Sequence, residues 1–256
     1  MFPKESPKMK TFLLMFIPLA VFSQSGREIA EMIKNRPSPD DLFNKTVMIL
    51  TNSKGKTRTH EMISKSKDGG EKQIIWFMEP KDDRGIAFLK IEHKNRDNEM
   101  RMWLPAFRKV RRISSKKKGE SFMGSDLSYE DLSNRELNDH DYKRLEDGTW
   151  LGRDCYVLEI IPKKELKSSY NRHVSWIDKN EMTNLKEQSF DKRNKLEKEK
   201  YFTYEKVGKY QLIKQVRVEN LLNKHTTEVM FSDMVINTGM SDKLFQEMSL
   251  RRLPLD

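Results

Sequence analysis

One pattern dominates the chain from residue 42 onward: segments of about six to ten residues rich in Val, Ile, Thr and aromatic side chains, separated by short turns. FNKTVMIL at 43–50 ends at NSKG, and THEMISKS at 59–66 ends at DGG. Because parallel neighbours need crossover connections of a dozen or more residues, turns this short predict antiparallel strands. Further strands are expected at 72–79, 87–93, 99–105, 109–114, 142–147, 155–161, 173–178, 184–190, 198–205, 211–220 and 226–237.

These segments predict a mainly β protein built on a single antiparallel sheet. Alternation such as Thr203 and Glu205 against Phe202 and Tyr204 indicates a sheet with one solvated face. Segments 72–79 and 155–161 are apolar on both faces, so parts of the sheet are expected to be covered on both sides.

Three segments break the strand pattern and are expected to pack on the sheet. Residues 26–35 have apolar side chains at helical spacing and end before Pro37, which predicts a short amphipathic helix. Residues 119–138 predict a loop with one or two short helices. The tail at 241–250 predicts a short helix anchored by Leu244, Phe245 and Met248.

The first 23 residues have the layout of a cleavable export signal. Three lysines precede a twelve-residue apolar run at 11–22, and small or polar residues follow it. We expect cleavage between Ser23 and Gln24, leaving residues 24–256 as one exported domain. The alternative of a buried N-terminal helix fits the polar flanks poorly.

The composition limits the kinds of partner that the protein can bind and the kinds of cross-link that can stabilise it. The chain has 49 Lys and Arg against 39 Asp and Glu, a net charge of +10, and removing residues 1–23 takes away three lysines and one glutamate, which leaves +8. An exported protein of this charge is expected to meet anionic lipid or acidic partners and no nucleic acid. The one cysteine, Cys155, cannot form an internal disulfide or a structural zinc site, so we expect a buried, unpaired thiol.

The search for catalytic chemistry finds no complete motif. His60-Glu61 begins like a zinc-protease motif, but Ser64 stands where the second histidine is needed. The carboxylate pairs Asp82-Asp83 and Glu130-Asp131 are interpreted as solvated turn charges. The expectation is therefore a protein with no enzymatic activity, catalytic residue, bound metal or cofactor.

Two features of the sequence are more frequent than the background: a cluster of basic residues, and aromatic and methionine side chains on the expected strands. The cluster has seven positive charges in eleven residues with no acid among them. One interpretation is a charged edge strand that blocks pairing with other chains, and the other is a docking surface for anionic head groups or an acidic partner. The cluster consists of Arg108, Lys109, Arg111, Arg112, Lys116, Lys117 and Lys118.

Three stretches, 83–89 (DRGIAFL), 102–113 (MWLPAFRKVRRI) and 121–132 (SFMGSDLSYEDL), resemble the outer membrane lipoprotein-sorting proteins of the LolA-like superfamily. The resemblance extends over roughly residues 26–253. It implies an incomplete, half-open antiparallel β-barrel of about eleven strands, with short α-helices covering the mouth of an apolar cavity. It also implies a periplasmic carrier that shelters acyl chains of a lipoprotein or another lipid for transfer toward the outer membrane.

The carrier interpretation assigns candidate residues to a cavity and a lid. The cavity candidates are Trp76, Phe88, Met102 and Leu104, and the lid candidates are Phe122, Met123, Gly124, Leu127 and Tyr129. The expected partners are acyl chains, an inner-membrane transporter and, transiently, a membrane surface, with the protein itself a monomer. The alternative is an exported interaction module that docks on an envelope transporter through the basic cluster.

Overall fold

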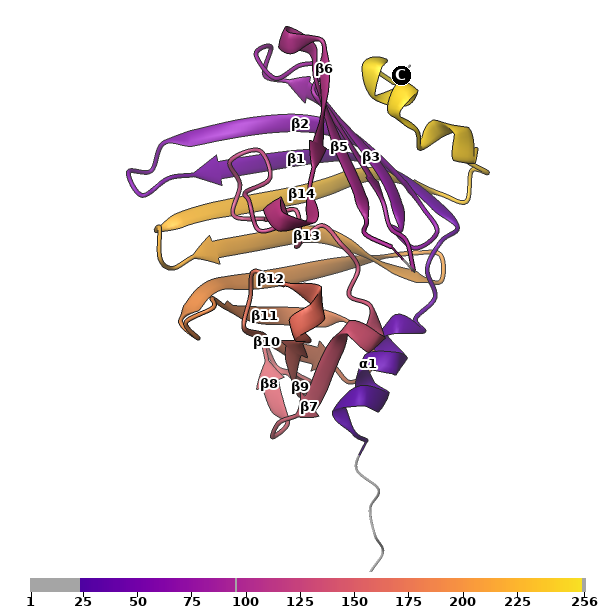
Figure 1. Ribbon diagram of the computed structural model, residues 1–256. Coiled ribbons are helices and arrows are strands. Elements are labelled where there is room, and N and C mark those ends of the chain that lie inside the picture. Colours follow the sequence, from indigo (N-terminus) through magenta and orange to yellow (C-terminus); the bar gives the residue numbers. More distant parts are fainter. Residues whose placement is uncertain (1–23, 95, 255–256) are drawn as a thin grey trace, which may run out of the picture.

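The computed structural model describes residues 24–94 and 96–254 (Figure 1). The expected export signal lies outside these residues. Helix α1 (Gly26–Lys34) begins with a capping box, in which the Ser25 side chain accepts from the backbone of Glu28 and the Glu28 side chain accepts from the backbone of Ser25. Its buried residue Ile29 packs against strands near the end of the sheet, as the sequence predicted. Within the described residues, no helix is long and apolar enough to cross a membrane.

The described residues form one antiparallel sheet of fourteen strands. Thirteen correspond to the segments expected from the sequence, and the additional one is the three-residue strand β8, where the sequence predicted no strand. The family resemblance implied about eleven. The strands are β1 (Asp41–Thr51), β2 (Thr57–Lys67), β3 (Lys72–Glu79), β4 (Ala87–Ile91), β5 (Glu99–Leu104), β6 (Lys109–Ile113), β7 (His140–Arg144), β8 (Gly148–Trp150), β9 (Arg153–Pro162), β10 (Arg172–Asp178), β11 (Asn184–Phe190), β12 (Leu196–Val207), β13 (Tyr210–Asn220) and β14 (His225–Ile236).

The strand order is β6-β5-β4-β3-β2-β1-β14-β13-β12-β11-β10-β9-β7, with β8 paired to β9. The first long strand, β1, therefore pairs with the last, β14, in the middle of the sheet, where Met48 lies opposite Val229. Among the described strands, β6 and β7 form the two ends of this order and do not pair with each other. The sheet is curved but open, as expected for an incomplete barrel (Figure 1).

The two faces of the sheet carry separate apolar clusters. Side chains alternate along β3, so Ile75 and Phe77 join one cluster while Ile74 and Trp76 join the other. We call the face with Phe77 the inner face, because it bounds the large cavity described below. This confirms that the strand at 72–79 is covered on both sides.

The C-terminal tail covers the outer face behind β3 to β5 (Figure 1). The tail forms two 3₁₀ turns, Asp242–Leu244 and Glu247–Arg251, rather than an α-helix. Leu244 and Phe245 pack on the outer cluster as predicted, but Met248 is exposed and its prediction as an anchor is wrong. Leu250 is buried instead, because the 3₁₀ geometry changes which side chains face the sheet.

Residues 119–138, here called the crossing segment, run over the inner face between β6 and β7. They contain turns, bends and one isolated bridge between Ser121 and Ser128. Of the one or two short helices that the sequence predicted here, this described segment has only the start of the 3₁₀ turn Leu137–Asp139. Frequent Ser, Asp and Gly favour such local turns over a helix. Short 3₁₀ turns occur at Pro105–Phe107, Ser115–Lys117, Leu137–Asp139 and Lys164–Leu166.

Candidate functional site

A cavity of about 990 Å³ lies between the inner face and the crossing segment. This volume is at the upper end of the range for small-molecule sites, roughly 300–1,000 Å³. Part of the wall is apolar and comes from strands in both halves of the sheet and from the crossing segment. Its apolar residues include Met48, Met62, Ile75, Met100, Phe122, Leu127, Phe202, Ile213, Val216, Val229 and Phe231.

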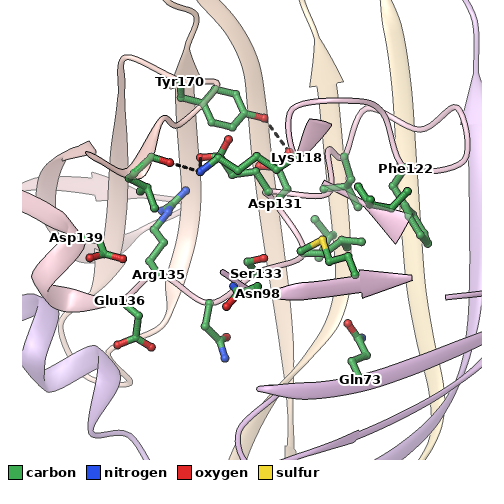
Figure 2. A pocket seen from close by; sticks show the side chains of 18 of the residues that line it. Gln73, Asn98, Lys118, Phe122, Asp131, Ser133, Arg135, Glu136, Asp139 and Tyr170 are labelled. Carbon is green, nitrogen blue, oxygen red and sulfur yellow. Dashed lines mark hydrogen bonds and ion pairs between the residues drawn. The ribbon is translucent and has the colours of Figure 1, made fainter. Parts of the chain in front are cut away.

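The remainder of the wall is polar and ionic. Figure 2 shows Arg135 and Asp139 on one side of the cavity and Phe122 on the other. Within the polar part, the Asp131 carboxylate pairs with Lys200 and lies 3.6 Å from the ammonium of Lys198. The Tyr170 hydroxyl donates to the same carboxylate at 2.8 Å. The backbone N–H and the hydroxyl of Ser128 also donate to Asp131, at 2.8 Å each, so its carboxylate has four partner residues.

A second carboxylate, Glu187 on β11, joins this cluster from the sheet. The guanidinium of Arg135 donates to both of its oxygens, at 2.5 and 2.9 Å, and Lys200 lies 3.2 Å away. The Arg135 side chain is 32% exposed, whereas that of Glu187 is 3% exposed. Arg135 thus forms the cavity-facing end of a buried ionic network, which we define as Asp131, Arg135, Glu187, Lys198 and Lys200.

Mutual pairing keeps the network charged. Burial is the largest single effect on the pKa of Asp131 and Glu187 and would raise both. At Asp131 the two lysines and their hydrogen bonds together outweigh burial, and at Glu187 Arg135 and Lys200 together do so, so both pKa values lie below their usual range. The pKa of Lys200 is correspondingly raised, because the two carboxylates outweigh its desolvation. The interpretation of Asp131 as a solvated turn charge is therefore wrong, since the folded chain buries it against lysines that sequence spacing did not bring together.

The crossing segment is tied to both halves of the sheet. On one side the ammonium of Lys90 on β4 donates to the carbonyl of Leu132 at 2.8 Å. On the other side Asp131 binds the lysines of β12, and Asp126 accepts from His225 at 2.6 Å on β14. The segment consequently forms the part of the cavity wall that faces the sheet.

Three buried histidines make stability depend on pH. Burial lowers the pKa of His60, His140 and His173, most strongly at His173. Below about pH 6.5 the unfolded chain takes up protons that the folded chain does not, so the free energy of unfolding falls as pH falls, by at most about 1.4 kcal/mol per pH unit for each histidine.

Urea unfolding between pH 8 and pH 5 measures how steeply the free energy of unfolding depends on pH. His173→Gln should make the slope shallower, while the difference between variant and wild type should stay constant above pH 7.5 or so; an unchanged slope would contradict the assignment.

The four cavity candidates from the sequence do not line the large cavity. Phe88 and Met102 are buried in the inner cluster, and Leu104 packs against it, but all three lie in the packed part of that face. Trp76 points to the outer face, where its indole N–H donates to the carbonyl of Ser249 at 3.3 Å. The sequence indicates a supply of large apolar side chains but not which face of each strand meets the cavity.

Of the lid candidates, Phe122 and Leu127 line the cavity. Tyr129 and Met123 belong to the packed region beside it, with the Tyr129 ring 5.9 Å from that of Phe122. Gly124 has a φ of +79°, which a glycine adopts without strain and which lets the chain turn back toward the bridge at Ser128. The crossing segment thus holds all five candidates, although only two of them face the cavity.

The basic cluster begins at the turn before β6 and follows this edge strand. All of its members are exposed except Lys118, which lines the cavity and donates to the carbonyl of Leu166 at 2.5 Å. Glu120 lies 3.2 Å from Arg111 and 3.0 Å from Lys117, so part of the charge is paired. An edge position fits both interpretations of the cluster, and its role stays a prediction.

No group of three or more side chains in the described part of the chain is arranged to hold a metal ion. Cys155 is fully buried, its thiol donates to the carbonyl of Arg153, and burial raises its pKa, so it is held as a thiol.

Comparison with known proteins gives two close structural relatives. A domain from Vibrio parahaemolyticus, described as an outer membrane lipoprotein-sorting protein, has a TM-score of 0.84 and 33% identity over 89% of this chain and 98% of its own. A DUF1329 family protein from Desulfovibrio piger has a TM-score of 0.84 and 31% identity over 88% of this chain and 97% of its own.

More distant comparisons agree with these two relatives. A LolA superfamily protein from Nitrosomonas europaea shares the fold, with a TM-score of 0.72 and 17% identity over 89% of this chain and all of its own. A family model described as an uncharacterized protein matches residues 69–252. The curated proteins contain no match. The chain therefore belongs to the same family as the DUF1329 family protein and the domain described as an outer membrane lipoprotein-sorting protein.

Proposed function

We propose that the protein is a periplasmic carrier that shelters the acyl part of a lipid or lipoprotein in its cavity for transfer toward the outer membrane. The observation that carries the proposal is a cavity of about 990 Å³ with an apolar wall and a separate ionic part. Such a wall suits an amphiphile, whose acyl chain would contact the methionines and phenylalanines while its polar end would lie toward Arg135. The expected export signal and the relative described as a sorting protein support the periplasmic location.

The energetics favour a carrier without covalent chemistry. Each buried methylene contributes roughly 0.8 kcal/mol, so an acyl chain of about a dozen methylenes gains enough to be held out of water. Methionine side chains adapt to flexible chains, and Met48, Met62 and Met100 are all part of the wall.

The test is mass spectrometry of lipids extracted from protein purified from the periplasm, combined with transfer of labelled lipid between two vesicle populations. A defined set of lipids at a fixed ratio to protein, and transfer that depends on the protein, are the expected results. Protein that is consistently empty and gives no transfer would rule the carrier function out.

Ile213 offers a variant that changes the cavity without disturbing the core. It lines the cavity and is 37% exposed, so Ile213→Asp should fold normally. A carboxylate beside the acyl chain loses its hydration when cargo binds, which should lower the bound lipid by about tenfold. The measurement is lipid per protein by mass spectrometry.

Val235→Asp is the matched control. Like Ile213, Val235 is an exposed β-branched residue on a strand, 48% exposed, but it is not among the residues that line the cavity. It should leave the lipid content within a factor of about two. Equal loss in both variants would mean that the effect comes from stability or surface charge rather than from the cavity.

A further inference from the structure

The two edges of the sheet at which its hairpins turn differ sharply in charge. Antiparallel pairing brings six connections to one edge, here called the turn rim, and this arrangement follows from the register of the strands. In Figure 1 the β1–β2, β13–β14 and β11–β12 turns of this rim lie one below another along the left side. The turn rim consists of residues 52–56, 80–86, 105–108, 163–171, 191–195 and 221–224.

The turn rim carries twelve lysines and arginines and four acids, and the structure exposes every one of these cations. Among the acids, Asp83 is buried against Arg58 and His60, which further reduces the negative charge at the surface. The cations are Lys54, Lys56, Lys81, Arg84, Arg108, Lys163, Lys164, Lys167, Lys192, Arg193, Lys195 and Lys224.

The opposite rim has no such excess. Its connections contain four lysines or arginines and five acids. These connections are residues 68–71, 92–94 with 96–98, 151–152, 179–183 and 208–209. Among the hairpin connections, the excess of positive charge therefore lies on one edge, although the sequence distributes the contributing residues over almost its whole length.

Exposed apolar side chains lie next to cations on the turn rim. Phe107 is 76% exposed at the tip of the β5–β6 connection and is followed by Arg108 and Lys109. Leu221 and Leu222 are exposed in the β13–β14 turn beside Lys224. The two apolar sites lie on different turns, each next to positive charge.

We propose that the turn rim is a docking surface for an anionic lipid bilayer. Adjacent strands are spaced roughly 4.8 Å apart, so the rim extends about 50 Å along the curved sheet, several times the Debye length of about 8 Å. Each lysine or arginine held near an anionic membrane contributes on the order of a fivefold gain in binding. Phe107 and the two leucines enter the interface between head groups, where an apolar side chain flanked by cations is favoured.

A protein partner fits this rim less well. Protein interfaces place apolar residues together in a core with charges around it. Here the apolar residues are separated, and the cations extend over six turns. An extended anionic surface matches that distribution, and docking of this kind is independent of which cargo the cavity binds.

The test is co-sedimentation with vesicles of phosphatidylcholine, alone or mixed with phosphatidylglycerol. Wild-type protein is expected to bind only the mixed vesicles, and binding should weaken as salt increases. Arg193→Glu with Lys195→Glu on the turn rim should lower the partition coefficient on the order of 30-fold. Phe107→Ser should lower it about tenfold.

The opposite rim supplies matched controls. Lys206→Glu with Lys209→Glu makes the same change in net charge at exposed positions near the β12–β13 turn. Leu151→Ser removes a side chain that is 86% exposed on the same rim. Both should bind mixed vesicles within about twofold of wild type.

Three outcomes would overturn the proposal: equal losses in both double variants, no binding of wild type to mixed vesicles, or equal binding to vesicles without anionic lipid. The lipid content of the purified variants is measured separately. If it is unchanged while vesicle binding is lost, the docking surface and the cavity act independently. An empty cavity with intact vesicle binding would refute the carrier proposal alone.

Discussion

Replacing Asp131 by alanine is expected to lower the free energy of unfolding by about 3–5 kcal/mol. The carboxylate is 2% exposed, pairs with Lys200 and lies 3.6 Å from Lys198. Without it, the ammonium groups of Lys198 and Lys200, residues only 6% and 4% exposed, lose an anionic partner, and Tyr170 loses the acceptor of its hydroxyl. Chemical denaturation at pH 7 or so measures the loss.

An exposed ion pair provides the comparison. Arg217 and Glu228 lie 2.8 Å apart on neighbouring strands, and both side chains are partly exposed to water. Glu228→Ala should cost less than about 1 kcal/mol, because solvent screens the pair. If Asp131→Ala cost as little, the ionic network would be hydrated like a surface pair, and the account of a buried network would fail.

The combined variant Asp131→Leu with Lys200→Met measures the net contribution of the ion pair to stability. The single variant instead includes the cost of leaving one partner buried without the other. Replacing both partners of a buried pair by apolar residues is often neutral or stabilising, so the double variant should be more stable than Asp131→Ala. Such a result would mean that the network is not required for stability. The role of the network would then be to provide the polar part of the cavity.

Trp76→Ala is expected to destabilise the protein by about 3–5 kcal/mol while leaving the bound lipid unchanged. Trp76 is buried on the outer face, where it packs among Ile63, Ile74, Ala87 and the C-terminal Leu250. Its removal opens a cavity on that face, opposite the face that would meet an acyl chain. Thermal unfolding measures the first effect, and lipid per folded protein measures the second.

The milder variant Trp76→Phe keeps this prediction testable if Trp76→Ala does not fold. It should show a smaller loss of stability and again a normal lipid content. Ile213→Asp should give the converse, a stable protein with little lipid. A large loss of lipid in Trp76→Phe would indicate that Trp76 contacts the bound lipid. It would contradict the assignment of Trp76 to the face opposite the cavity.

Much of the fold could be predicted because its signals are local. Each hairpin has its strand pattern and its turn residues within about twenty neighbouring positions, so thirteen strands could be placed from their own segments. Helix α1 likewise has its start signal at Ser25 and its end before Pro37. The strand β8 was missed because three residues are too few to show an alternating pattern.

The ionic network could not be predicted in the same way. Strand β12 begins LEKEK, and residues 197–200 are all polar, so this segment by itself does not show which face is buried. Phe202 further along the strand places Lys198 and Lys200 on the apolar face by alternation, but it does not identify their partners. Burial of Lys198 and Lys200 depends on Asp131 and Glu187, which lie on other elements of the sheet and the crossing segment. A weak signal exists in β11, where Leu185, Glu187 and Ser189 alternate with Lys186 and Gln188 and place Glu187 on the apolar face.

The sequence by itself determined the class of fold. Strands joined by short turns can give their backbone N–H and C=O groups hydrogen-bond partners by forming an antiparallel sheet. It also determined the net charge and the supply of apolar side chains. Only the tertiary structure decided which of those side chains face the cavity, that Asp131 is buried, and that cations from six separate turns share one edge. Those properties depend on pairings between distant strands, such as β1 with β14, and the free energy of such contacts is not encoded in any local segment.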